Sequence, residues 1–286
     1  MAAVQRILVA TDFSPHADRA LDWAVALARR FAAELQLVTS VFALPMAPAA
    51  PGYAMPTDYL RGAREAADRR LHELVGSLEK QGLRAGYAVL HEDPSSGICA
   101  RAKEVRADLV ALGTRGRSGL GHVLLGSVAE RVARLAPCPV LTVHAEVASP
   151  APLRKLLVPT DFSRPAERAL QLARTLVEPG GTLVLAHAIP PVLGPGDAPL
   201  PDPSSEAWAR DEFAKLAPAL DGVPAELDLR FGAPDTAVLA AAEAHRVDLI
   251  AMGTRGRTGL AHVLLGSVAE RVIRRSPLPV VTARAG

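Results

Sequence analysis

The sequence lacks the features that mark several common classes of protein. Its two cysteines, Cys99 and Cys138, are too few for a disulfide framework and lack the CxxC spacing of a metal site, so we expect each to pack as a small apolar side chain. No apolar run approaches the roughly 18–20 residues of a membrane span. The run at 7–10 is too short for the core of a signal peptide and is typical of a buried strand. We therefore expect a cytoplasmic protein.

Strong charge of either sign is also lacking. The formal net charge is +2, which gives no basis for a nucleic-acid or membrane partner. The 286 residues, 49% of them hydrophobic, are enough for two globular domains of about 140 residues each.

Two familiar phosphate-binding motifs are missing as well. No G-x-x-x-x-G-K-[ST] occurs, which excludes a P-loop NTPase. No G-x-G-x-x-G follows the first predicted strand, which argues against a dinucleotide site of the Rossmann type. Any phosphate site must therefore use another loop.

What the chain does have is an internal repeat. Residues 113–140 and 253–280 are identical at 22 of 28 positions, and the segment at 6–14 is matched by the one at 155–163. A repeat of this length indicates domain duplication rather than a solenoid. The predicted domains span residues 1–146 and 153–286, and the Ala- and Pro-rich stretch 147–152 has the composition of a linker.

Short apolar runs alternate with helical patterns in each copy, which predicts a doubly wound α/β fold with a parallel sheet. Ser14 followed by Pro15 is typical of a helix start. The segments 43–59 and 190–205 are rich in Ala and Pro without periodicity, and we interpret them as flaps. The predicted strands are 6–10, 35–41, 84–90, 108–112 and 139–143, then 155–159, 182–188, 225–231, 248–252 and 279–283; the predicted helices of the first copy are 15–31, 60–81, 96–106 and 127–135.

The repeated segment has the composition of a phosphate cradle. Gly113 ends the fourth predicted strand, where a missing side chain would let a ligand approach the backbone. We expect Gly116 to take a positive φ and turn amide groups toward one point. Gly126 and Ser127 begin a helix, whose free amides and dipole attract anions. The counterparts in the second copy are Gly253, Gly256, Gly266 and Ser267.

Structural interpretations stand beside these functional ones. Ser127 with Glu130, like Ser267 with Glu270, reads as a capping box, a role compatible with phosphate binding by the main chain. Asp12 could be a ligand contact or a turn former. The same two interpretations apply to Asp161. The arginines of the loops could screen phosphate charge or lie on a solvated face, and the histidines could act as general bases or serve packing or surface roles; these residues are Arg115, Arg117, Arg255, Arg257, His122 and His262.

The combination of G-x2-G-x9-G-[ST] after an apolar strand with a Thr-Asp-Phe-Ser first turn resembles the universal stress protein family. The Pro-Cys-Pro-Val stretch at 137–140 adds to the likeness, which covers nearly the whole chain as two tandem domains. The resemblance implies five-stranded parallel sheets of order 3-2-1-4-5, each domain being Rossmann-like and similar to the adenine nucleotide alpha hydrolases. It also implies the ATP-binding branch of the family and pairing between domains.

Carried over position by position, the resemblance places Asp12 and Asp161 beside the adenosine, and Val41 and Ala188 at the adenine. His187 then corresponds to Ser40. The predicted nucleotide-binding residues are Asp12, Val41, Gly113, Thr114, Arg115, Gly116, Arg117, Gly126, Ser127 and Val128 in the first copy, and Asp161, Ala188, Gly253, Thr254, Arg255, Gly256, Arg257, Gly266, Ser267 and Val268 in the second.

Three functions follow as hypotheses. The first is a stress-response regulatory protein that binds ATP, with Mg²⁺ as a companion to the phosphates, and acts through an unidentified protein partner. It would form an internal pseudo-dimer of its two domains, or a homodimer. The second is a slow ATPase or self-phosphorylating enzyme, although no catalytic residue or dedicated metal site is recognisable. The third is a structural dimerisation protein whose glycines only build turns.

Overall fold

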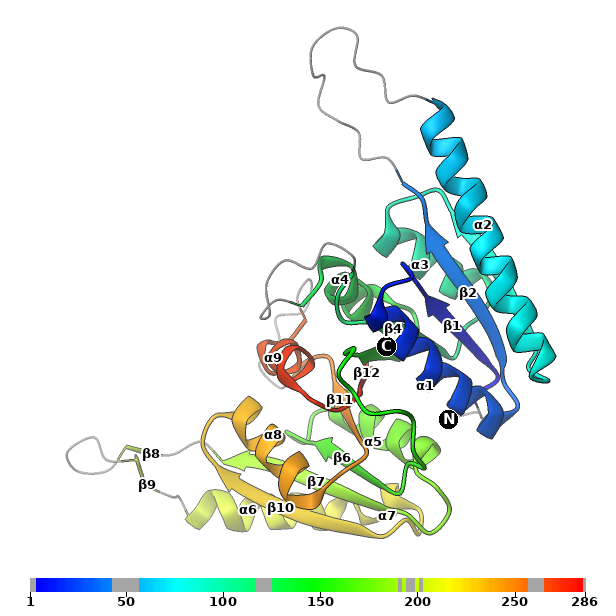
Figure 1. Cartoon of the computed structure of the whole chain (residues 1–286). Coiled ribbons are helices and arrows are strands. Elements are labelled where there is room, and N and C mark those ends of the chain that lie inside the picture. Colours follow the sequence, from blue (N-terminus) through cyan, green and yellow to red (C-terminus); the bar gives the residue numbers. More distant parts are fainter. Residues whose placement is uncertain are drawn as a thin grey trace, which may run out of the picture. The chain divides into compact units, whose positions relative to one another are not determined.

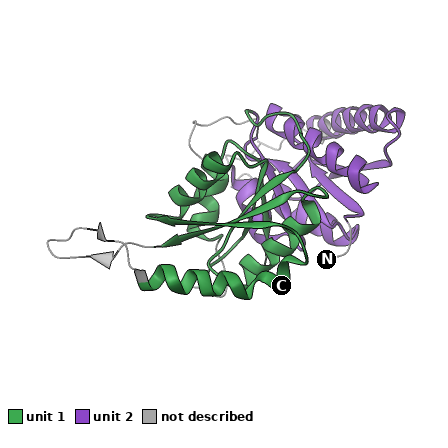
Figure 2. Cartoon of the chain, turned by 90° about the horizontal axis from the view of Figure 1, so that it is seen from below, with its two compact units in different colours: residues 1–3, 121–125, 146–286 green, residues 4–120, 126–145 purple. Residues whose placement is uncertain are grey.

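The structure is a computed structural model that describes residues 4–42, 57–116, 125–189, 192–193, 199–200, 203–256 and 265–284. The chain divides into two compact units (Figure 2). We call the described residues within 4–145 the first domain and those within 146–284 the second domain, and each is described by itself.

Helices and strands alternate along both domains (Figure 1). The elements of the first domain are β1 (Arg6–Ala10), α1 (Pro15–Phe31), β2 (Glu34–Ser40), α2 (Thr57–Lys80), β3 (Ala85–Leu90), α3 (Pro94–Glu104), β4 (Leu109–Gly113), α4 (Ser127–Leu135) and β5 (Val140–Val143). Those of the second domain are β6 (Lys155–Pro159), α5 (Arg164–Leu176), β7 (Thr182–Ile189), β8 (Val192–Leu193), β9 (Pro199–Leu200), α6 (Pro203–Lys215), α7 (Ala217–Leu220), β10 (Ala225–Phe231), α8 (Pro234–His245), β11 (Leu249–Gly253), α9 (Ser267–Arg275) and β12 (Val280–Ala283).

The predicted fold is confirmed in both domains. The strands of the first domain lie in the order β3-β2-β1-β4-β5, and those of the second in the equivalent order β10-β7-β6-β11-β12, with parallel pairing within each domain. Helices cover the sheets, and the strands β1 and β4 are almost wholly buried, as expected of parallel strands covered on both faces. Among the described helices, none is long and apolar enough to cross a bilayer.

The start of α1 forms as the sequence predicts. Ser14 is the N-cap residue, its hydroxyl accepts a hydrogen bond from the amide of Ala17 at 3.4 Å, and Pro15 takes the first helical position. One face of α1, with Trp23 and Leu27 among its buried side chains, then packs on the sheet. The helix therefore begins directly after the turn that follows β1.

The opposite ends of the central strands are joined by an aspartate in each domain. Asp108 accepts hydrogen bonds from the amides of Gln5 and Arg6 at 2.8 and 2.9 Å. Asp248 accepts in the same way from two successive amides at the start of β6, at 2.7 and 2.8 Å. The repeat thus extends to side-chain contacts outside the 28-residue segment.

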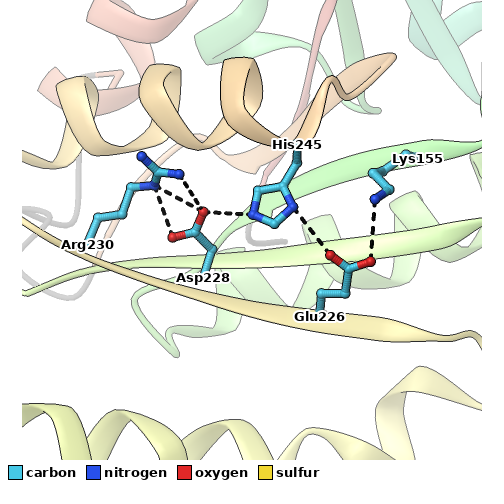
Figure 3. Close-up of polar contacts among 5 residues, drawn as sticks. All are labelled: Lys155, Glu226, Asp228, Arg230 and His245. Carbon is cyan, nitrogen blue, oxygen red and sulfur yellow. Dashed lines mark hydrogen bonds and ion pairs between the residues drawn. The ribbon is translucent and has the colours of Figure 1, made fainter.

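The second domain also carries a charged network on β10, its outermost strand (Figure 3). Asp228 receives hydrogen bonds from Arg230, and it faces Nε2 of His245 at 2.8 Å. Nδ1 of His245 lies 3.3 Å from Glu226, which also pairs with Lys155 at 3.4 Å. The contacts connect β10 to the C-terminal residue of α8 and to the first residue of β6.

The ends of several elements differ from the predicted ones by one to three residues. Helix α2 begins at Thr57 rather than residue 60, and α3 begins at Pro94 rather than residue 96. The predicted flap at 43–59 lies largely outside the described residues. In the flap at 190–205 the described part includes the antiparallel pair β8–β9 and the start of α6, which the sequence did not predict.

Asp93 gives the first domain a pH-dependent helix cap that the second domain lacks. Hydrogen bonds from the Ser95 hydroxyl and the Ser96 amide hold the pKa of Asp93 below its ordinary value, whereas Ala233 at the same position of α8 makes no side-chain cap bond. Because the folded-state pKa is lowered, the cap stabilises above the unfolded-state pKa of about 3.9 and is lost as the pH falls through the folded-state pKa.

We therefore expect Asp93→Ala to lower the free energy of unfolding by about 1 kcal/mol at pH 7 and by progressively less as the pH falls below about 3.9 and through the folded-state pKa of Asp93. Urea denaturation of the variant and the parent across this range measures the difference. Asp93→Asn is the control, because the amide retains the cap but does not titrate. An Asp93→Ala effect that is the same at pH 7 and pH 3 would contradict this account.

Candidate functional site

A cavity of about 820 Å³ opens at the carboxyl ends of β1, β2 and β4 in the first domain. In doubly wound sheets ligands bind beyond these strand ends. Nine of the ten residues predicted for the first copy line this cavity, and Arg117 lies outside the described residues. The nine are Asp12, Val41, Gly113, Thr114, Arg115, Gly116, Gly126, Ser127 and Val128.

The turn after β1 holds the Asp12 carboxylate in place. One oxygen, Oδ1, accepts a hydrogen bond from the Ser14 amide at 3.1 Å, and the Thr11 hydroxyl accepts one from the Phe13 amide at 2.9 Å. Phe13 takes a left-handed φ of 62°, which is rare for a bulky residue and costs about 1–3 kcal/mol. Asp12 is thus a turn former whose second oxygen remains at the cavity, so the two interpretations of this residue are compatible.

Gly116 faces that second oxygen. A Cβ at this position would lie 2.8 Å from Oδ2 of Asp12, so the absence of a side chain lets the loop and the carboxylate approach each other. The prediction of a positive φ at Gly116 and Gly256 is wrong, because neither glycine has one. The left-handed residue of this region is instead Phe13, on the facing turn.

Gly113 has a structural task that the sequence did not predict. A Cβ there would lie 2.7 Å from the carbonyl carbon of His16 and 2.9 Å from the amide nitrogen of Ala17. The same contact recurs in the second domain, where a Cβ at Gly253 would lie 2.9 Å from the carbonyl carbon of Pro165. The missing side chain therefore allows the central strand to pack against the first helix, while Gly113 also lines the cavity.

The start of α4 also differs from its prediction. Gly126 is the N-cap residue and makes no side-chain cap bond, so the capping box expected of Ser127 and Glu130 is not formed. Gly266 takes the same place in α9, where the equivalent prediction for Ser267 is likewise wrong. Ser127 is instead the first residue of the helix and lines the cavity, which places its hydroxyl and the first amides of α4 together at this end of the site.

Sequence reasoning missed other residues that line the cavity, among them Thr39, Tyr59 and Arg70. The Arg70 guanidinium lies 4.3 Å from the centre of the Phe13 ring, in a cation–π arrangement. Tyr59 is 67% exposed, so its ring is available to a ligand. No motif marks these positions, since two of them lie on α2 and reach the site only through the packing of that helix.

The turn and loop of the second domain repeat this geometry. Phe162 has a φ of 59°, and Oδ1 of Asp161 accepts a hydrogen bond from the Ser163 amide at 3.1 Å. A Cβ at Gly256 would lie 2.6 Å from Oδ2 of Asp161. The described residues of the second predicted set therefore keep the arrangement of the loop; Arg257 lies outside them.

The strand register corrects one predicted equivalence. Ala10 and Pro159 are counterparts in the repeat, and they pair with Val38 of β2 and Ala186 of β7. Three positions after Val38 lies Val41, and three positions after Ala186 lies Ile189. The counterpart of Val41 is therefore Ile189 rather than Ala188. By the same register His187 corresponds to Thr39 and not to Ser40. The equivalence predicted between β2 and β7 from the sequence was therefore shifted by one residue.

Beside the first cavity, two histidines surround the buried hydroxyl of Thr114. Nδ1 of His144 lies 2.9 Å from this hydroxyl, and Nδ1 of His16 accepts a hydrogen bond from the Ala145 amide at 3.0 Å. A pair of histidines can bind a metal ion. A metal bound to Nε2 of a histidine favours a proton on Nδ1, whereas Nδ1 of His16 accepts a hydrogen bond and therefore carries no proton here. We therefore assign these side chains to the packing of α1 against the end of β5.

Cys138 is a partly buried thiol at the entrance to β5. Burial raises its pKa to about 12, with smaller contributions from Asp108 and Cys99. At neutral pH the side chain is therefore the unreactive thiol rather than the nucleophilic thiolate. This agrees with the interpretation of Cys138 as a small apolar side chain.

Similarity to known proteins identifies the family of this chain. The model of the universal stress protein family matches residues 3–144 and again residues 152–284. The chain belongs to the universal stress protein family. It is a member of the tandem type, with one family domain in each half.

Relatives of the same length support this assignment to tandem universal stress proteins. One from Mycolicibacterium smegmatis is 29% identical over 290 positions, covering 97% of this chain and 96% of that protein. Universal stress protein Rv2623 of Mycobacterium tuberculosis is 28% identical over the same shares of both chains. The crystal structure of a universal stress protein from Archaeoglobus fulgidus superposes with a TM-score of 0.75 at 27% identity, covering 99% of this chain and 97% of that one.

Proposed function

We propose that this universal stress protein binds ATP in the cavity of its first domain and acts as a stress-response regulator whose conformation depends on the bound nucleotide. The observation that carries the proposal is the convergence of the predicted residues on one cavity. A volume of about 820 Å³ lies in the usual range for small-molecule sites, about 300–1,000 Å³.

The two ends of the cavity differ in chemistry, as a nucleotide requires. Apolar groups such as Val41 and Leu112 surround the end beside β2 and β4, where a base would bind. Gly126 and Ser127 lie at the start of α4, where the helix dipole and the first amides attract phosphate, and Gly116 lines the cavity from the loop after β4. Asp12 lines the same cavity, and the proposal assigns its carboxylate to the ribose hydroxyls.

Mg²⁺ would enter this site with the triphosphate. The oxygens of ATP chelate the ion, which keeps several waters when it binds proteins. The residues of the cavity would then hold and orient the nucleotide, and the proposal assigns them no role in bond cleavage.

Calorimetric titration of ATP into the protein, with Mg²⁺ present, tests the proposal. We expect saturable binding by the parent, and binding about tenfold weaker by Gly126→Ala, a loss of about 1.4 kcal/mol. The added Cβ would lie 3.1 Å from the Thr114 carbonyl oxygen, so the loop must shift at the phosphate end. Gly62→Ala on α2 is the control, because a Cβ there meets nothing within 4 Å.

Two other results would each select a different function. Steady release of ADP during long incubation would favour the slow ATPase or self-phosphorylating enzyme. No binding of ATP, ADP or AMP by the folded parent would contradict the proposal and leave the structural dimerisation protein.

A further inference from the structure

Three aromatic rings gather at the carboxyl ends of β6 and β7 in the second domain. We call Phe162, His187 and Trp208 the aromatic cluster. The ring centres of Phe162 and His187 are 4.9 Å apart, those of Phe162 and Trp208 are 5.3 Å apart, and those of His187 and Trp208 are 5.8 Å apart. Each ring therefore contacts both others, at separations typical of favourable aromatic pairs.

These rings lie at positions that surround the cavity in the first domain. Phe162 is the counterpart of Phe13, with the same left-handed backbone. His187 is the counterpart of Thr39 by strand register, and Thr39 lines the cavity. Trp208 comes from α6, the helix that packs on β7 in the second domain as α2 packs on β2 in the first.

The two helices present side chains of different size. Helix α2 contributes three alanines to the lining of the first cavity, and its Arg70 lies over Phe13. Helix α6 instead brings the indole of Trp208 onto Phe162, edge to face at 84°. Trp208 therefore lies against Phe162 as Arg70 lies against Phe13, but it adds a third ring to the second domain, whereas the first domain has the alanines of α2 and Thr39 beside its cavity.

The cluster leaves no slot for a purine between its rings. A base stacked between two rings needs them roughly parallel and about 7 Å apart, twice the carbon–carbon contact distance. The observed centres are closer than this, and the planes meet at 45°, 84° and 63°. His187 is also anchored, because its Nδ1 donates a hydrogen bond to the Thr160 carbonyl oxygen at 2.8 Å.

The phosphate end of the second domain keeps the geometry of the first. The Gly266 amide donates to the Thr254 carbonyl oxygen at 2.8 Å, as the Gly126 amide does to the Thr114 carbonyl oxygen. The two domains therefore differ at the base end of the site and agree at the phosphate end.

We propose that the chain binds one adenine nucleotide, in the first domain, and that the aromatic cluster excludes the base from the second. This inference rests on the proposed function and refines it, since the repeated loop alone suggested two sites. Trp208 and His187 are the residues that determine the difference between the domains.

Calorimetric stoichiometry with ATP and Mg²⁺ tests the inference. We expect one site per chain in the parent, and two in the double variant Trp208→Ala/His187→Thr, which restores side chains of the first-domain type. Adding Gly266→Ala should weaken only the second of these sites. Trp208→Phe is the matched control and should retain one site, because an aromatic ring still fills the space.

A second measurement does not depend on the folding of that double variant. In a Trp23→Phe background Trp208 is the only tryptophan, because the chain contains two. Saturating ATP should leave its emission unchanged. Two sites in the parent, one site in the folded double variant, or a shift of Trp208 emission on saturation would each overturn the inference while the proposed function stands. Absence of binding by every variant and the parent would overturn both.

Discussion

A Gly113→Ala variant is expected to lose about 3 kcal/mol of stability in the first domain, the upper part of the range for overpacked cores. The added methyl would meet the backbone of α1 at 2.7–2.9 Å, distances that real Cβ atoms essentially never show. Backbone at a helix start has no rotamer to change, so either the helix or the strand must move. The measurement is urea denaturation followed by circular dichroism.

Gly62→Ala is again the matched control, because it adds the same methyl on α2 where nothing lies within 4 Å. It should leave stability unchanged or raise it by up to about 1 kcal/mol, since alanine favours the helix over glycine. A Gly113→Ala protein as stable as the Gly62→Ala protein would show that Gly113 is not required for packing, and its role at the cavity would need to be reconsidered.

The second large effect is expected at Arg275. Its guanidinium lies 2.9 Å from Asp235, whose side chain is only 5% exposed, and Arg271 lies further from the same carboxylate at 3.7 Å. Arg275→Leu would leave a buried carboxylate without its closest partner. We expect a loss of about 1–3 kcal/mol in the second domain, the cost of an unsatisfied buried polar group.

The first domain supplies the control for this prediction. Its residues at the two positions are Ser95 and Leu135, so Asp235→Ser/Arg275→Leu copies a pair that already occurs in this fold. The double variant should recover most of the stability that Arg275→Leu loses, as thermal denaturation of the parent and the two variants would measure. Equal losses in the single Arg275→Leu and the double variant would show that the ion pair is not the cause.

The sequence predicted the α/β fold and the strand order because both depend on patterns that are local or repeated. Buried runs such as the one at 109–112 and the Ser14–Pro15 helix start each carry a direct signal, and the duplication shows it twice. The resemblance to the universal stress proteins rested on the same residues. Nine of the residues that line the cavity could also be predicted, because they follow strand ends or begin a helix.

What could not be predicted depends on packing between distant segments. Ser127 followed by Glu130 fits a capping box, but the close approach of the loop to Thr114 makes Gly126 the N-cap residue. The left-handed residue is Phe13 rather than Gly116 because the turn, with its Thr11 and Asp12 hydrogen bonds, imposes that conformation. Trp208 carries no local signal at all, since its role arises from where α6 meets β7.

The charged network of β10 has a consequence for self-association. Glu226, Asp228 and Arg230 occupy alternate positions of a strand that ends its sheet, and charges on such an exposed edge discourage addition of a strand from another chain. The strand at the equivalent position of the first domain, β3, has the sequence Ala-Gly-Tyr-Ala-Val-Leu and carries no charge. If the folded protein aggregates by strand addition, we expect addition at β3 rather than at β10.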